Sequence, residues 1–299
     1  IVGGGATGIE VAGILSEMKK FVLPNDYPDM PSSLMHIYLI EAGPRLLAGM
    51  SEESSAHAEQ FLREMGVNIL LNKRVVDYRD HKVVLEDGTE IATRTFIWVS
   101  GVTGVTIGNL DASLIGRGGR IKVDSFNRVE GMNNVFAIGD QCIQVADEDY
   151  PNGHPQLAQV AIQQGELLAK NLVRMEKGRE MKPFHYRNLG SMATVGRNRA
   201  VAEFSKVKMQ GWFAWVMWLV VHLRSILGVR NKVIVLLNWI WNYFTYDQSM
   251  RMIVYARKAK EIRDREKLEE TNHWGKELIQ EPKQHSPQEI QQASELEKK

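Results

Sequence analysis

Cysteine is almost absent from this sequence of 299 residues, in which Cys142 stands alone. A single cysteine excludes a disulfide framework and a C-x-x-C redox pair within these residues, and a reducing compartment is the simplest interpretation. A charge bias is lacking too, because 37 basic residues are balanced by 36 acidic ones. The overall charge therefore gives no indication of a nucleic-acid partner.

Apolar runs long enough to cross a membrane are also missing. Residues 209–223 and 233–246 contain no Asp, Glu, Lys or Arg, but each run is shorter than the ~20 residues that a spanning helix needs. Five of the seven tryptophans lie in this region, and basic residues separate the runs: Arg224, Arg230 and Lys232. Aromatic residues flanked by basic ones favour amphipathic helices lying in a membrane surface. A homodimer interface or a buried core helix is the alternative.

Glycine is concentrated at the start of the chain. Gly3, Gly5 and Gly8 fit G-x-G-x-x-G, the pattern of a strand-to-helix turn that binds a dinucleotide pyrophosphate. The helix that follows offers free N–H groups to the phosphates. Only Ile1 and Val2 precede the turn, whereas a strand has about five or six residues. We therefore expect the beginning of the protein to be missing from this sequence.

An acidic residue ends the next predicted strand, at residues 36–40. Glu41 is the carboxylate expected to accept a hydrogen bond from the ribose 2′-hydroxyl. It comes later than the usual ~20 residues because the proline-rich residues 23–31 intervene as a predicted loop. A carboxylate repels a 2′-phosphate, so Glu41 favours NADH over NADPH. The alternative is an ordinary exposed glutamate at a strand end.

The remaining pattern predicts an α/β protein. Helices are expected over residues 6–18, from Ser51 to Gly66, and over 156–175. Asp87-Gly88 predicts a hairpin turn between strands at 82–86 and from Glu90 onward. Apolar strands are expected at 67–71, 75–78, 95–99 and 135–138, and further strands within 184–205.

A second candidate nucleotide-binding motif follows the predicted strand at 135–138. Gly139 and Asp140 come directly after it, and ligands gather at the carboxyl ends of strands in open α/β sheets. An aspartate there can accept hydrogen bonds from the ribityl chain of a flavin. Asp after Gly is also common in turns.

The order of these motifs resembles flavoproteins that have two dinucleotide-binding domains. The segments Trp-Val-Ser-Gly-Val at 98–102, Asn-Val-Phe-Ala-Ile-Gly-Asp at 134–140 and Ala-Gln-Val-Ala-Ile-Gln-Gln at 158–164 carry the resemblance. With the aromatic C-terminal region, they are similar to the type II NADH dehydrogenases, the non-electrogenic NADH:quinone oxidoreductases. The resemblance implies a Rossmann-like NAD-binding domain inserted in an incomplete FAD-binding domain, followed by amphipathic membrane-associated helices.

The resemblance also implies domain bounds. These are an NAD-binding domain at 1–103, the C-terminal part of the FAD-binding domain at 104–180, a sheet segment at 181–208, membrane-anchoring helices at 209–255, and a charged, partly disordered tail at 256–299.

Roles for individual residues follow from the resemblance. Glu10 contributes to nicotinamide contact or proton handling, although a glutamate in a first helical turn also complements the helix dipole. Gln159 and Gln163 face the quinone; the alternative is a solvated helix face. The cofactor-binding residues would be Gly3, Gly5, Gly8 and Glu41 for NADH, Gly101 and Val102 near the nicotinamide, Gly139 and Asp140 for FAD, and Ala158 and Gln159 at the flavin ring. No metal site is expected.

The implied activity is hydride transfer from NADH to FAD, then transfer of two electrons to a membrane quinone without proton pumping. The protein would be a peripheral membrane protein on the cytoplasmic face of the inner membrane. One alternative is another reductase of the same fold, such as a sulfide:quinone or ferredoxin reductase. Another is a catalytically incomplete fragment that binds NADH and membrane, and we expect these residues alone to be inactive.

Overall fold

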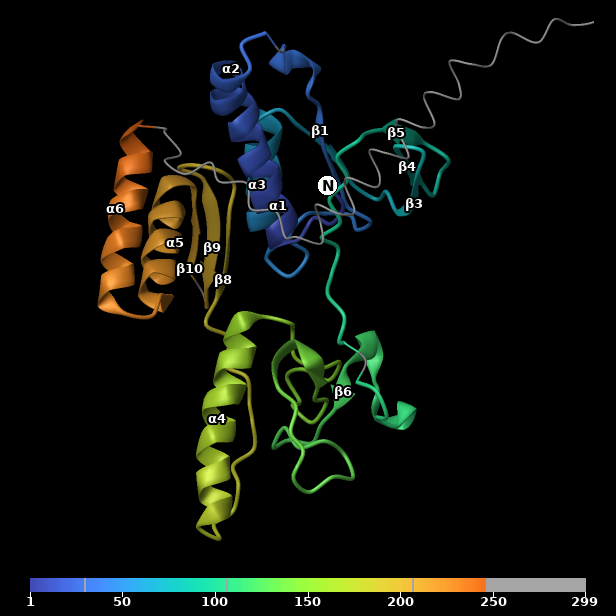
Figure 1. Ribbon diagram of the computed structural model, residues 1–299, viewed down its shortest axis with the longest axis vertical. Coiled ribbons are helices and arrows are strands. Elements are labelled where there is room, and N and C mark those ends of the chain that lie inside the picture. The colour runs from blue at the N-terminus through green and yellow to red at the C-terminus, as the bar shows by residue number, and fades with distance from the viewer. Residues whose placement is uncertain (30, 106, 206, 246–299) are drawn as a thin grey trace, which may run out of the picture. The chain divides into compact units, whose positions relative to one another are not determined.

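The computed structural model describes residues 1–29, 31–105, 107–205 and 207–245 (Figure 1). The chain forms two compact units, residues 1–238 and 239–299. Most of the second unit, including the tail predicted at 256–299, lies outside the described residues.

A parallel sheet lies at the start of the first unit. Strand β1 (Ile37–Ile40) pairs in parallel with β2 (Val67–Leu70), and Val2 bridges both Ile40 and Trp98 in parallel. The Val2 N–H donates to the Ile97 carbonyl at 2.8 Å, and the Val99 N–H donates to the Val2 carbonyl at 2.8 Å. The residues that lead into the glycine turn therefore occupy the middle of the sheet.

Helix α1 (Ala6–Glu17) follows the turn, as predicted, but the helical backbone continues further than expected. A π-helical turn, η1 (Met18–Val22), and a short helix, α2 (Leu23–Asp26), come next, and a 3₁₀ turn, η2 (Ser32–Leu34), precedes β1. The prediction of a loop from residue 23 was wrong at its start. Pro24 lies in the first turn of α2, a position that commonly accepts proline.

Helix α3 (Glu52–Glu64) follows β1 and matches the helix predicted from Ser51 to Gly66. The Ser51 hydroxyl caps it by accepting from the Ser54 N–H at 3.3 Å. Beyond β2, an antiparallel meander comprises β3 (Val75–Arg79), β4 (Lys82–Leu85) and β5 (Glu90–Ala92). The predicted turn at Asp87-Gly88 is confirmed, with Gly88 at φ +83°.

The middle of the chain is less regular than predicted. It contains the 3₁₀ turns η3 (Ala112–Leu114), η4 (Arg117–Gly119) and η5 (Gly139–Gln141), the parallel pair β6 (Ile121–Lys122) and β7 (Cys142–Ile143), and α4 (Ala158–Glu176). The strands predicted at 95–99 and 135–138 are reduced to isolated bridges at Trp98 and Phe136. Each has a paired neighbour, because Val2 bonds to Ile97 and Val99 and residues 127–129 bond to Val135 and Ala137, but neither pairing extends far enough to form a regular strand.

The C-terminal part begins with an antiparallel sheet of β8 (Ser191–Thr194), β9 (Ala200–Phe204) and β10 (Val207–Gln210). Helices α5 (Gly211–Ser225) and α6 (Val229–Thr245) follow. Within the described ranges, none of the helices combines the length and apolar character needed to cross a bilayer.

The sheet of β8 and β9 shares a hydrophobic core with the nucleotide-binding region. Ala193, Val195 and Val201 pack in one cluster with Ile9 of α1 and Leu39 of β1. Gly13 permits this packing, because a Cβ atom there would lie 2.7 Å from the Gly196 nitrogen. The C-terminal sheet therefore rests directly on α1.

We predict that Gly13→Ala lowers the free energy of unfolding by about 1–3 kcal/mol, the usual cost of overpacking. Alanine in a helix gains only ~1 kcal/mol over glycine, and the backbone atoms facing Gly13 cannot move aside as a side chain can. Urea denaturation measures the change. Gly49→Ala is the control, because no atom lies within 4 Å of a Cβ there. Equal stability of the two variants would contradict the close packing.

Candidate functional site

The glycine turn has the geometry of a phosphate-binding loop. A Cβ on Gly8 would lie 1.9 Å from the Gly3 carbonyl oxygen, and one on Gly3, at φ +114°, would lie 2.8 Å from the Ser100 Cα. Gly5 faces open space and carries no side chain to cap α1. The first N–H groups of α1 are thus left for an anionic ligand.

Glu41 reaches back over this turn from the end of β1. Its Oε2 accepts from the Gly4 N–H at 2.5 Å, and its Oε1 accepts from the Gly43 N–H at 2.7 Å. A Cβ on Gly4 would lie 2.7 Å from Leu46 Cδ2 and 2.9 Å from Glu41 Oε2, so the Glu41 side chain packs closely on this glycine. The carboxylate is half-buried and keeps lone pairs for a hydroxyl donor.

Glu10 extends from the next turn of α1 toward the C-terminal sheet. Its Oε1 accepts from both the N–H and the hydroxyl of Thr194, each at 3.4 Å. This contact joins residues 184 positions apart in the sequence. Sequence reasoning identified Glu10 but not its partner.

Gly101 and Val102 follow the bridge at Trp98 and are both exposed. Gly101 has φ +109°, a conformation that glycine adopts readily. The segment leaves the carboxyl end of the parallel sheet beside Gly3, because Ser100 packs on that glycine. The two residues are therefore on the side of the sheet where the glycine turn lies.

Gly139 and Asp140 lie beside the beginning of α4. The Gly139 N–H donates to Gln164 Oε1 at 2.7 Å, and a Cβ on Gly139, at φ +65°, would lie 3.2 Å from the Ala161 Cβ. Asp140 and Ala158 are exposed. The two residues of the second predicted nucleotide-binding motif therefore lie beside the uncapped start of α4 at Leu157.

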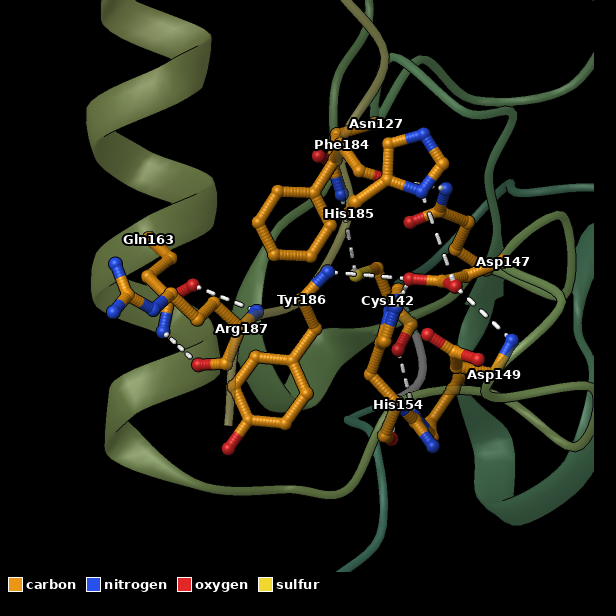
Figure 2. Close-up of polar contacts among 12 residues, drawn as sticks. Asn127, Cys142, Asp147, Asp149, His154, Gln163, Phe184, His185, Tyr186 and Arg187 are labelled. Atoms are coloured by element: carbon orange, nitrogen blue, oxygen red, sulfur yellow. Dashed lines mark hydrogen bonds and ion pairs between the residues drawn. The ribbon is translucent and has the colours of Figure 1, made fainter. Parts of the chain in front are cut away.

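The side-chain amides of α4 hold the extended segment 182–190. Gln163 Nε2 donates to the Arg187 carbonyl at 2.9 Å, and its Oε1 accepts from the Arg187 N–H at 3.1 Å (Figure 2). Gln159 bonds likewise to the Gly190 carbonyl and the Leu189 N–H, and Asn171 bonds to both backbone groups of Lys182. The amides of Gln159 and Gln163 are therefore already engaged with backbone.

A buried carboxylate that sequence reasoning missed lies behind this segment. Asp147 Oδ2 is 2.9 Å from His154 Nε2 and accepts from the Tyr186 N–H at 3.2 Å (Figure 2). Asp147 and His154 are 4% and 2% exposed. Burial opposes ionisation of Asp147, but these donors outweigh it and hold its pKa below the usual value. The only sequence signal was the presence of Asp147 and His154 seven positions apart in the segment before α4.

Cys142 is a buried free thiol. Burial raises the pKa of this thiol, and the hydrogen bond with Gln164 lowers it by a smaller amount. A buried, protonated thiol is a poor nucleophile.

The chain matches the family profile of the pyridine nucleotide-disulphide oxidoreductases over residues 1–165. The chain belongs to this family. Residues 188–246 match the NDH2 C-terminal domain, which confirms the resemblance to the type II NADH dehydrogenases. The α/β fold is confirmed by the solved structure of NDH2 from Plasmodium falciparum in complex with NADH. That structure has a TM-score of 0.73 and 20% sequence identity over 82% of this chain and 65% of the other.

Curated relatives of this family member are similar over most of its length. The type II NADH:quinone oxidoreductase NdhA of Mycobacterium tuberculosis is 35% identical, over 80% of this chain and 52% of its own. The internal alternative NAD(P)H-ubiquinone oxidoreductase A1 of Arabidopsis thaliana is 32% identical, over 81% of this chain and 50% of its own. The chain thus spans about half the length of the curated relatives it matches.

We predict that Asp147→Asn lowers the free energy of unfolding at pH 7 by about 1–3 kcal/mol, because buried N–H donors lose a charged acceptor. A lowered folded-state pKa stabilises the fold above the unfolded pKa of ~3.9, and that contribution is lost as the pH falls below it. The difference from wild type should therefore narrow between pH 5 and pH 3 in urea denaturation. Asp149→Asn, at an exposed neighbour, is the control. If the stability difference between Asp147→Asn and wild type did not change with pH, the electrostatic role of Asp147 would be ruled out.

Proposed function

We propose that this chain is the NADH-binding and membrane-facing part of a type II NADH:quinone oxidoreductase. The observation that carries the proposal is the Glu41 carboxylate held over the Gly3–Gly8 turn by the Gly4 and Gly43 N–H groups. The pyrophosphate of NADH would bind the start of α1, and its ribose would donate to Glu41. The same carboxylate would repel the 2′-phosphate of NADPH.

The residues at Gly139 and Asp140 fit a flavin nucleotide. The exposed Asp140 carboxylate would accept from the hydroxyls of FAD, and the exposed Ala158 would leave room for a flat ring at the start of α4. Bound FAD would supply the two-electron chemistry that no side chain provides. Gly101 and Val102 would line the nicotinamide end of the NADH site, and Glu10 would contact the nicotinamide or handle a proton.

The quinone would approach the same end of α4. Gln159 and Gln163 would form the wall of that approach, with their amides fixing residues 187–190 in place. A sulfide:quinone reductase would require reactive cysteines, and the buried, raised-pKa thiol of Cys142 does not support that alternative.

A membrane surface is the proposed partner of α5 and α6. Large apolar side chains are exposed on α5, including Phe213 at 70%. On α6 the exposed side chains include Ile234 and Leu237. Arg224 and Arg230, between the apolar runs, would meet anionic headgroups. We propose peripheral attachment at the cytoplasmic face of the inner membrane, and dimerisation through the same helices is the competing possibility.

We predict that Glu41→Ala raises the dissociation constant of NADH roughly 10- to 100-fold, as loss of hydrogen bonds to a charged group does. Binding of NADPH should be weak in wild type and should change little or improve in the variant. Fluorescence titration of the 299-residue chain with each nucleotide measures both constants. Glu166→Ala, an exposed glutamate of α4, is the control. Equal affinity of wild type for NADH and NADPH would contradict the role of Glu41.

We predict that the wild-type chain co-sediments with vesicles of phosphatidylglycerol and phosphatidylcholine. Replacement of Trp212 and Phe213 by serine should reduce the bound fraction at least several-fold, because both side chains would leave the lipid interface. Leu34→Ser removes an exposed apolar residue outside α5 and α6 and should bind as wild type does. A chain that stays in the supernatant and sediments as a dimer in ultracentrifugation would favour the dimer interface instead.

A further inference from the structure

The C-terminal sheet contacts α1 at three consecutive points. Thr194 donates to Glu10, the Val195–Gly196 backbone packs on Gly13, and the Arg197 N–H donates to Glu17. Residues 10, 13 and 17 lie on one face of a helix because they are three and four positions apart. The segment 194–197 therefore runs along α1 in a defined register.

The packing around this register is buried and closely fitted. Ile9 and Ala12 of α1 and Ala193 and Val195 of the sheet region are all 0% exposed. Gly196 is at φ +73°, and a Cβ there would lie 2.8 Å from Glu17 Oε1. Tight packing of this kind transmits small displacements rather than absorbing them. The hydroxyl of Thr194 is thus held in place relative to Glu10.

Both Thr194 bonds end on the same oxygen of Glu10. Oε1 accepts from the N–H and from Oγ1, and Oε2 accepts from no donor among the described residues. A carboxylate has acceptor sites on both oxygens. With Oε1 bound to Thr194, Oε2 keeps its acceptor sites for an N–H of a ligand.

We infer that Thr194 is a positioning residue of the dinucleotide site, which orients Glu10 toward the carboxamide of the nicotinamide. The inference rests on the proposed NADH site and extends it: the C-terminal sheet completes that site. Thr194 acts only through Glu10, so its effect is confined to the nicotinamide half of the ligand. The adenosine half is bound by the glycine turn and Glu41.

The test compares NADH with ADP-ribose, which lacks the nicotinamide, in titrations of the 299-residue chain. Thr194→Val keeps the shape of the side chain and removes its donor. It should raise the dissociation constant of NADH about 3- to 10-fold, the range for one hydrogen bond, and leave that of ADP-ribose unchanged. Thr194→Ser, which restores the hydroxyl, should recover most of the NADH affinity. In the Glu10→Gln background, Thr194→Val should have a smaller effect.

Glu17→Gln is the matched control, because Glu17 anchors the same segment at its far end. It should lower the free energy of unfolding without changing the ratio of the two dissociation constants. If Thr194→Val raised both dissociation constants by the same factor, or changed neither, the positioning role would be overturned. In that case, binding of ADP-ribose would still support the dinucleotide site. A wild-type chain that binds neither ligand would overturn that site and this inference with it.

Discussion

The approach of α1 to the strand at Val2 is the constraint on which the rest of the structure depends. The Gly8 Cα lies so near the Gly3 carbonyl that a Cβ would be 1.9 Å from its oxygen. This contact directs the N-terminus of α1 at the space beside Gly5. It also places Ile9 and Ala12 in the core that the C-terminal sheet shares. One close contact thus organises the phosphate turn and the docking of a distant sheet.

Carboxylates accept from backbone N–H groups of elements that are far apart in sequence, as Glu10 and Glu17 of α1 do. Glu41 fastens the glycine turn to the end of β1. Glu203 of β9 accepts from the Ser51 N–H and from the hydroxyls of Ser51 and Ser54 at the start of α3. Asp147 holds Tyr186 and His154. Hydrogen bonds to a charged acceptor are stronger than neutral ones, so each is suited to fixing an irregular junction.

The local patterns predicted the regular elements well and the irregular ones poorly. The Ser51 cap, the Asp87-Gly88 turn and the helix after the glycine turn are encoded within a few neighbouring residues, and all are confirmed. The strands expected at 95–99 and 135–138 form only short bridged pairings, because the length of a strand depends on how far its neighbour pairs with it, which an apolar run does not specify. The helical turn at Leu23–Asp26 was missed because proline in a first helical turn resembles proline in a loop.

The sequence by itself determined the chemistry: which glycines make the turn, which acid follows β1, and which family the motif order resembles. Only the tertiary structure decided what those residues touch. Thr194 reaches Glu10 across 184 positions, and the amides of Gln159 and Gln163 bond to backbone rather than to solvent. Such partners come from the packing of distant segments, whose register depends on close contacts such as that at Gly13 and not on any local pattern.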